Sequence, residues 1–409
     1  MMTTIAPKAE RFTSIDTLRG FAVLGILMMN VQAFAMVFPA YVWPPAHMDI
    51  TGANLDVWFY SHVFFAMKAM TTFSALFGAG IVLMLGEEKN ANLGLHYRRM
   101  IWLLVIGLVH GWIFWSGDIL VPYAVMGMLV VFARRMSVTG LMIFGSILIV
   151  LGGALMAMIF VFIPYMPEDQ IQLAFTPTPE MVAESVALYH EGFLARLPAN
   201  MALTMQNEIG QVTFFAPRLA GAMLVGMALY KSGFLTLKWS AGKYLIAGVI
   251  ALGVGLPATW MATEHHVETG FAVDELWLGE TANYFLSPIV AFGYAAVIML
   301  LCKIGLFRWI LYPFTAAGRM AFTNYLSQTL IMTFLFVGPP GLGWFGTMER
   351  VEQAQLVFIV WIAQLIISPI WLHFFRFGPL EWVWRSLSYW RLQPMRKNAT
   401  SEPLPPTPA

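Results

Sequence analysis

Long apolar stretches recur along almost the whole of this chain. A helix that crosses a bilayer needs about 20 mostly apolar residues, within a range of roughly 17 to 25. Ten stretches meet or approach that length: 18–38, 58–85, 100–116, 119–133, 139–165, 213–231, 243–262, 283–302, 318–338 and 354–375. The third and fourth are short and are joined by WSGD, which indicates a tight hairpin. The sequence therefore predicts an all-α, polytopic integral membrane helix bundle of about ten transmembrane helices.

The composition excludes several other classes of protein. Hydrophobic residues make up 59% of the chain and charged residues only 11%, whereas a soluble domain carries about 25% charge. The net charge of +1 argues against nucleic-acid binding. A single cysteine, Cys302, excludes an intramolecular disulfide and a cysteine-based metal cluster. No convincing cleavage site follows the first apolar run, so we expect a retained span rather than a signal peptide.

The positions of Lys and Arg predict the orientation of the chain. With the N-terminus placed in the cytoplasm, all but four of the 23 basic residues fall in cytoplasmic segments; the exceptions are Lys68, Arg196, Arg218 and Arg350. Because cytoplasmic loops of membrane proteins are enriched in Lys and Arg, both termini are predicted to be cytoplasmic. This orientation fits a multi-pass protein of a bacterial inner (plasma) membrane.

The segments between the spans indicate one multi-span domain over residues 1–397. The longer outer loops are 39–57 and 166–212, and the second has hydrophobic residues at helical spacing near 179–196. Residues 305–317 are typical of an interfacial helix on the inner leaflet. Residues 398–409 are rich in proline and are predicted to be a disordered tail.

The stretch SIDTLRGFAVLGILMMN places three polar residues on one side of the first span. Arg19 and Asn30 are 11 residues apart, which at about 100° per residue brings them within roughly 20° of the same face and about 16 Å apart along the axis. Asp16 lies one turn before Arg19 on that face. This polar stripe is either a functional track or a structural clasp, in which Arg19 snorkels and Asn30 binds a neighbouring helix.

Several histidines gather on the predicted outer side. They are His47 in the first outer loop, His62 in the second span, and His110 at the end of the third, followed by Asp118. A histidine near a carboxylate can act as a general base at neutral pH. A lone histidine at a membrane interface is also a common amphipathic anchor. No HxxxH or Cys/His spacing supports a metal site, and we expect no metal.

Two further polar positions lie at membrane depth. Lys68 requires a carboxylate, a carbonyl or a water-filled cavity, and either binds a phosphate or thioester or forms a structural pair. In GRMAFTNYLSQT, Arg319 begins the ninth span, and Asn324 and Gln328 share a face four residues apart. These amides either hold helices together or line a polar vestibule open to the cytoplasm.

Four blocks carry a family resemblance that extends over nearly the whole chain. They are SGDILVPYAVMGML (116–129), PRLAGAMLVGMALYKSGF (217–234), GRMAFTNYLSQT (318–329) and FGPLEWVWRSLSYW (377–390). By these blocks the chain resembles the YeiB-like membrane proteins, whose domain has no known function. That resemblance alone implies no reaction.

A second resemblance lies in the first span and suggests an activity. SIDTLRG with Asn30 is similar to the opening of the heparan-α-glucosaminide N-acetyltransferase family, within the transmembrane acyltransferase superfamily. The resemblance implies transfer of an acyl group from cytoplasmic acyl-CoA, such as acetyl-CoA, to an extracytoplasmic hydroxyl or amine, often on a carbohydrate. It implies His47 as the catalytic base and Asn30 as its oxyanion-stabilising partner, with His62 or His110 (beside Asp118) as alternatives for the base.

On this hypothesis cationic and polar groups hold the acyl-CoA from the cytoplasmic side. These groups are Arg19, Lys68, Arg319 and Asn324. The competing interpretations are a transporter of a small solute, which broken helices at mid-membrane would favour, and a non-catalytic membrane scaffold. Acyl transfer also predicts a continuous tunnel that joins Arg19 to His47.

Overall fold

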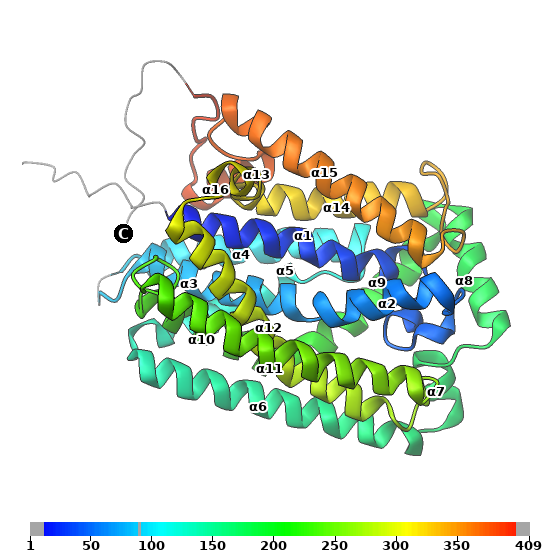
Figure 1. Ribbon diagram of the computed structural model, residues 1–409. Helices are drawn as coiled ribbons and strands as arrows, with labels where there is room; N and C mark the ends of the chain where they lie inside the picture. Colours follow the sequence, from blue (N-terminus) through cyan, green and yellow to red (C-terminus); the bar gives the residue numbers. More distant parts are fainter. Residues whose placement is uncertain (1–11, 89–90, 398–409) are drawn as a thin grey trace, which may run out of the picture.

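The computed structural model describes residues 12–88 and 91–397 as one bundle of helices (Figure 1). The predicted disordered tail, 398–409, lies outside the described residues, as do the basic residues Lys8, Arg11 and Lys89. An isolated bridge between Phe375 and Arg396 is the only β pairing in the described part. The predicted all-α fold is therefore confirmed.

The helical elements follow one another with short connections. In chain order they are α1 (Thr13–Ala35), η1 (Phe38–Tyr41), η2 (Pro44–Ala46), α2 (Gly52–Phe64), α3 (Lys68–Leu85), α4 (Leu93–Val109), η3 (His110–Phe114), α5 (Leu120–Val130), η4 (Val131–Arg135), α6 (Val138–Phe162), η5 (Ile163–Tyr165), α7 (Glu168–Ala174), α8 (Pro179–Glu191), α9 (Phe193–Gly210), η6 (Gln211–Phe215), α10 (Ala216–Lys231), α11 (Ala241–Glu268), α12 (Leu276–Ile304), α13 (Arg308–Arg319), α14 (Ala321–Phe336), α15 (Arg350–Phe374) and α16 (Pro379–Tyr389).

Eight helical stretches of the described chain are long and apolar enough to cross a membrane. They are Thr13–Ala35, Gly52–Leu85, Leu93–Phe114, Val138–Tyr165, Phe193–Lys231, Ala241–Glu268, Leu276–Ile304 and Arg350–Phe374. The two other predicted spans correspond to α5, with 11 residues, and α14, with 16. At 1.5 Å per residue α14 is about 24 Å long, which is shorter than a bilayer core of about 30 Å.

The outer surface of the bundle is suited to lipid. Along α6 and α11, aliphatic side chains such as Ile143, Val150, Ile246 and Val249 are exposed over successive turns. Burying such side chains in hydrocarbon is favourable in the same way as burying them in a protein core. The chain is therefore a multi-pass protein embedded in a lipid bilayer.

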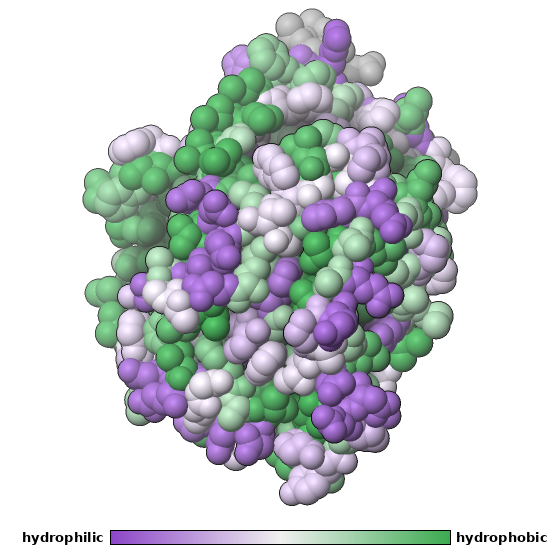
Figure 2. All heavy atoms as spheres, turned by 90° about the vertical axis from the view of Figure 1, so that its right-hand side faces the viewer, coloured by the Kyte–Doolittle hydropathy of each residue, from purple (hydrophilic) through white to green (hydrophobic). Residues whose placement is uncertain are grey.

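The two ends of the bundle differ in what they contain. The start of α1 lies with α13 and α16 at the left end of Figure 1, and α7 and α8 lie at the right end. Figure 2 views that right end and shows many hydrophilic side chains on it. We call the left end the inner end and the right end the outer end, following the orientation predicted from Lys and Arg.

The second predicted span is interrupted. Helix α2 ends at Phe64 and α3 begins at Lys68. Between them Met67 has a φ of 62°, in the left-handed region that non-glycine residues seldom adopt. Hydropathy alone predicted one continuous helix, because the three residues at the break are as apolar as their neighbours.

The long outer loop is mostly helical. Its predicted helix near 179–196 corresponds to α8, which begins at Pro179 after Thr178, whose hydroxyl caps the helix by accepting from the backbone N–H of Met181 at 3.3 Å. Helix α9 continues through the π-helix η6 into α10, so the predicted span at 213–231 begins at Phe193, about five and a half turns earlier than expected.

Helix α13 packs tightly against α1 instead of lying only at the interface. A Cβ added at Gly20 would lie 1.9 Å from the carbonyl oxygen of Phe314, and one at Gly318 would lie 1.8 Å from that of Asp16. The two helices therefore touch backbone to backbone. This contact fixes the inner end of α1, where Arg19 is located.

Candidate functional site

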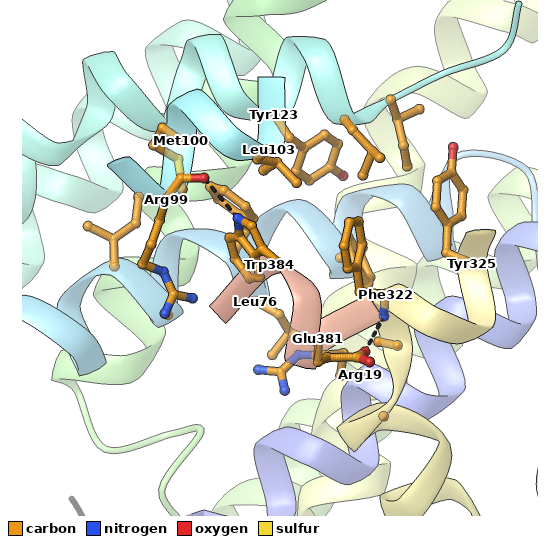
Figure 3. A pocket seen from close by; sticks show the side chains of 18 of the residues that line it. Arg19, Leu76, Arg99, Met100, Leu103, Tyr123, Phe322, Tyr325, Glu381 and Trp384 are labelled. Atoms are coloured by element: carbon orange, nitrogen blue, oxygen red, sulfur yellow. Dashed lines mark hydrogen bonds between the residues drawn. The ribbon is translucent and has the colours of Figure 1, made fainter. Parts of the chain in front are cut away.

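A cavity of about 250 Å³ lies near the inner end of the bundle (Figure 3). Most of its walls are apolar and come from α1, α3, α4, α5 and α14, among them Phe73, Leu76, Met100, Leu103 and Tyr123. Two predicted site residues, Arg19 and Arg319, line it, together with Arg99, which the sequence reasoning counted only for orientation. The cavity thus combines an apolar interior with three guanidinium groups.

Each guanidinium group is held by a neighbour. Arg19 pairs with Asp16 at 2.8 Å, as the spacing of the two residues predicts. Arg99 lies over the indole of Trp384, 4.3 Å from the ring centroid, and its carbonyl oxygen accepts from the indole N–H. Arg319 donates to the carbonyl of Arg376. The cavity wall therefore has a positively charged region suited to an anionic group.

Helix α16 closes one side of this cavity. Its Glu381 accepts hydrogen bonds from the backbone N–H groups of Phe322 (2.8 Å) and Thr323 (3.1 Å) and from the Thr323 hydroxyl. A carboxylate is favoured at a helix N-terminus, where N–H groups are free, so Glu381 caps α14 from a distant part of the chain. Burial raises the pKa of the Glu381 carboxyl, although the bonds to Thr323 and Phe322 act in the opposite direction.

A buried relay of three side chains lies next to the cavity. His110 Nδ1 and Asp118 Oδ1 are 2.6 Å apart, and His110 Nε2 and Thr329 Oγ1 are 2.9 Å apart. The other carboxylate oxygen, Asp118 Oδ2, accepts from the backbone N–H of Val121 at 2.8 Å. Asp118 is acceptor-only when ionised, so it fixes the proton of His110 on Nδ1 and leaves Nε2 free to accept from Thr329.

Local structure explains the position of this relay. His110 begins the π-helical turn η3, and such turns are frequent at functional sites. Asp118 follows in the hairpin before α5, and Thr329 lies about midway along α14. The ring of Tyr325, one turn before Thr329, has its centroid 5.4 Å from that of His110 and also lines the cavity. The relay therefore adjoins the cavity behind Tyr325.

Helix α9 secures the carbonyl groups that the π-helical turn leaves free. Asn200 donates to the carbonyls of Gly111 (2.9 Å) and Trp112 (3.0 Å), and Thr204 donates to Gly111 at 2.8 Å. Arg196 donates to Phe114. The sequence predicted an outer loop over 166–212 with a helix only near 179–196, so these contacts were missed.

His47 lies elsewhere, in a groove of about 720 Å³ at the outer end. The groove is lined by the loop around Trp43 and by α8, including His190. His47 Nδ1 accepts from the backbone N–H of Val37 at 3.3 Å, so in the neutral ring the proton is on Nε2. Burial, followed by the charge of Arg350, lowers the pKa of His47. His47 is therefore suited to donate a hydrogen bond rather than to accept a proton.

The inner cavity and the outer groove share no lining residue. The tunnel expected between Arg19 and His47 is thus not formed by these two spaces. Asn30 is half-buried on α1 and lines neither of them. The predicted pairing of Asn30 with His47 stays a prediction.

Two other predicted site residues are held in helix contacts away from the cavity. Asn324 donates to Ala317 O and Ser368 Oγ at 3.1 and 3.2 Å, joining α14 to α13 and α15. Lys68 is 1% exposed and donates to His62 O (3.0 Å) and Asn283 Oδ1 (2.6 Å). The structure does not bring either side chain together with Arg19 and Arg319.

Some functional candidates were absent from the sequence reasoning. Arg99, Tyr325, Thr329 and Trp384 complete the cavity and the relay. A threonine or a tyrosine in an apolar helix carries no distinctive signal by itself. Its significance depends on which helix lies opposite, and that is a property of the tertiary structure.

Comparisons with known proteins find similarity over most of the chain. A family model described as "Protein of unknown function (DUF418)" matches residues 229–391. The chain is 31% identical over 386 residues to the uncharacterized protein YeiB of Escherichia coli (strain K12), covering 93% of this chain and 96% of that protein. It is 28% identical over 420 residues to the uncharacterized protein YxaH of Bacillus subtilis (strain 168), covering 95% and 96%. Both relatives are described as uncharacterized, and their descriptions name no activity.

Proposed function

We propose that this chain, which belongs to the YeiB-like (DUF418) family of membrane proteins, is an acyl-CoA-dependent transmembrane acyltransferase. It takes an acyl group such as acetyl from cytoplasmic acyl-CoA and transfers it to an extracytoplasmic hydroxyl or amine, with carbohydrates among the acceptors. The membrane is the bacterial inner membrane. The observation that carries the proposal is the arginine-lined cavity beside the Asp118–His110–Thr329 relay.

The inner cavity suits the donor. Ligand pockets generally measure about 300–1,000 Å³, so a space of about 250 Å³ is matched to the acyl thioester arm and not to a whole nucleotide. The phosphates of CoA would remain at the cytoplasmic side, beside Arg19, Arg99 and Arg319. Guanidinium groups are the preferred partners of phosphate because their N–H groups match its oxygens.

The relay supplies the base. His110 accepts the proton of the acceptor hydroxyl or amine at Nε2 while Asp118 stabilises the resulting imidazolium at Nδ1. The acceptor atom then attacks the thioester carbonyl, the C–S bond breaks, and the thiolate leaving group takes the proton from Nε2. The Thr329 hydroxyl, 2.9 Å from Nε2, marks where the acceptor hydroxyl would lie. This is the orienting role that a buried carboxylate has in a Ser-His-Asp triad.

His110 is a better base than His47 in this arrangement. The resemblance to the acetyltransferase family implied His47, but the hydrogen bond from Val37 to Nδ1 leaves Nε2 of a neutral His47 protonated. We propose that His47 instead helps to bind the acceptor in the outer groove. A transfer step also requires that the donor in the cavity reaches His110. Tyr325 lines the cavity, and its ring centroid lies 5.4 Å from that of His110.

A second candidate function is a transporter, which the break at Phe65–Met67 favours. Discontinuous helices line the substrate sites of many transporters. Here the break is followed directly by Lys68, which is buried among polar groups of α2 and α12. Solute flux driven across liposomes is the property that would separate this function from acyl transfer.

The test uses the purified full-length chain in liposomes with radiolabelled acetyl-CoA and a panel of hydroxyl and amine acceptors. We expect label transfer and CoA release in the wild type, strong loss in His110→Gln, and little change in His373→Gln, an exposed histidine at the end of α15. Binding of CoA without turnover in His110→Gln would support the assigned role. Release that persists in both His110→Gln and Asp118→Asn would refute it, and absence of CoA binding together with solute flux would favour the transporter.

A further inference from the structure

A second cluster of chemically active side chains lies in the outer half of the bundle, apart from the cavity and the relay. It consists of His62 at the end of α2, His266 near the end of α11 and Glu280 near the start of α12. One ligand atom of each residue lies within 4.8 Å of the others. These three residues share no lining position with the inner cavity.

The two histidines of this cluster are buried, and three of their four ring nitrogens are buried without a hydrogen-bond partner. His62 is 6% exposed and His266 is 2% exposed. Nε2 of His62 and both ring nitrogens of His266 have no partner within hydrogen-bonding distance. Buried polar atoms are nearly always paired, so each exception requires an explanation. A bound ion between the side chains would provide one.

The surroundings hold the ligand atoms in place. Trp58 packs on His62 with ring centroids 5.1 Å apart and meets His266 edge-on at 6.3 Å. A Cβ on Gly279 would lie 2.1 Å from Nε2 of His266, so only glycine allows the imidazole to lie against α12 there. The next residue is Glu280, and its Oε1 is 3.8 Å from Nε2 of His266.

The distance of 3.8 Å between Glu280 Oε1 and His266 Nε2 is too long for a hydrogen bond. It is close to the distance between two ligand atoms of one metal ion. Two zinc–ligand bonds of about 2.0–2.2 Å at a tetrahedral angle place their ligand atoms roughly 3.3–3.6 Å apart. The Lys68 ammonium is nearby, but it donates its hydrogen bonds to His62 O and Asn283 Oδ1. Glu280 therefore retains carboxylate oxygens for a cation, and its side chain is 12% exposed, which offers an entry path.

We propose that His62, His266 and Glu280 bind a divalent transition-metal ion, with Zn²⁺ as the best match. Imidazole and carboxylate ligands suit zinc and similar ions better than calcium or magnesium. Two histidines and one glutamate leave one tetrahedral position open, which is the arrangement of catalytic zinc sites and not of closed structural ones. The inference does not depend on acyl transfer, and it replaces the sequence-based expectation that no metal is bound.

The test measures metal directly on the full-length chain, purified in detergent, freed of any histidine tag and treated with a chelator. Added ZnCl₂ is expected to bind at one equivalent per chain by isothermal titration calorimetry and elemental analysis. Co²⁺ in its place is expected to give the intense visible absorption of a tetrahedral site. Glu280→Gln and His266→Asn should weaken binding by more than the 10–100-fold that second-shell changes cause.

Two further variants separate this site from adventitious binding. Gly279→Ala removes no ligand but displaces the His266 ring, so it should also weaken zinc binding. His265→Asn removes the neighbouring histidine, which pairs with the partly exposed Glu275 at 3.3 Å, and should leave binding unchanged. Size-exclusion profiles identify any variant that misfolds. The variants that fold then decide whether zinc binds at His62, His266 and Glu280. Zinc binding that is absent in the wild type, or that survives in folded Glu280→Gln and Gly279→Ala, would overturn the proposal.

Discussion

Replacing Gly318 by alanine should separate two helices that touch backbone to backbone. The new Cβ would lie 1.8 Å from the carbonyl oxygen of Asp16, whereas real Cβ atoms essentially never approach closer than 3.0 Å. Helices α1 and α13 would have to move apart by about 1.2 Å, the difference of these two distances. Because both neighbours are backbone, no side chain can rotate to relieve the contact.

The loss of stability expected for Gly318→Ala is the difference between two opposing contributions. Overpacking in a dense interior typically costs about 1–3 kcal/mol, and alanine in place of glycine in a helix returns up to about 1 kcal/mol. We expect a net loss of about 1–2 kcal/mol for Gly318→Ala. At roughly 2–4 °C per kcal/mol, the apparent Tm should fall by about 2–8 °C.

The assay is the intrinsic tryptophan fluorescence of detergent-solubilised protein during heating, at a fixed scan rate because unfolding of such proteins is often irreversible. Gly253→Ala is the matched control, since Gly253 lies inside α11 and a Cβ there meets nothing within 4 Å. That variant should keep or raise the Tm. Gly20→Ala should lower the Tm as Gly318→Ala does. The Tm of the double variant should fall by less than the sum of the two single decreases, because the two glycines share one contact. A Tm for Gly318→Ala equal to that of Gly253→Ala would refute the backbone contact.

Three further outcomes follow from the described contacts. Asp118→Asn should lower the kcat of CoA release by a factor of about 10²–10⁴ and leave the affinity for CoA unchanged, because Asp118 orients His110 but does not line the cavity; equal losses in kcat and affinity would contradict this role. Arg350→Met removes the donor to Pro44 O (2.8 Å) and Asp49 O (2.7 Å), so amide hydrogen exchange should become faster over residues 39–51 and stay unchanged in α6. Burial raises the pKa of Glu381 above its ordinary 4.5, so its contribution to stability is full below about pH 4.5 and is lost as the pH rises through the raised value. The Tm of the wild type minus that of Glu381→Gln should therefore fall between pH 4 and pH 8, and a rise would show that the sign is wrong.

The sequence by itself determined the class of fold and the local features. Hydropathy depends on the composition of about 20 consecutive residues, so the apolar stretches could be recognised without knowing their neighbours. The pairing of Asp16 with Arg19 depends only on helical spacing, and the structure has it at 2.8 Å. The helix near 179–196 was recognisable for the same reason, because its hydrophobic residues recur at helical spacing.

Tertiary structure alone decided which polar groups meet. His62 comes about 200 residues before His266 and Glu280 in the chain, and no spacing indicates that these three side chains converge. The break before Lys68 is invisible to hydropathy, because a left-handed Met67 is as apolar as a helical one. Glu381 caps α14 from 58 residues away, and Thr329 becomes part of a relay only because α14 lies beside His110. A site depends on distances between elements, and those are set by packing after the helices have formed.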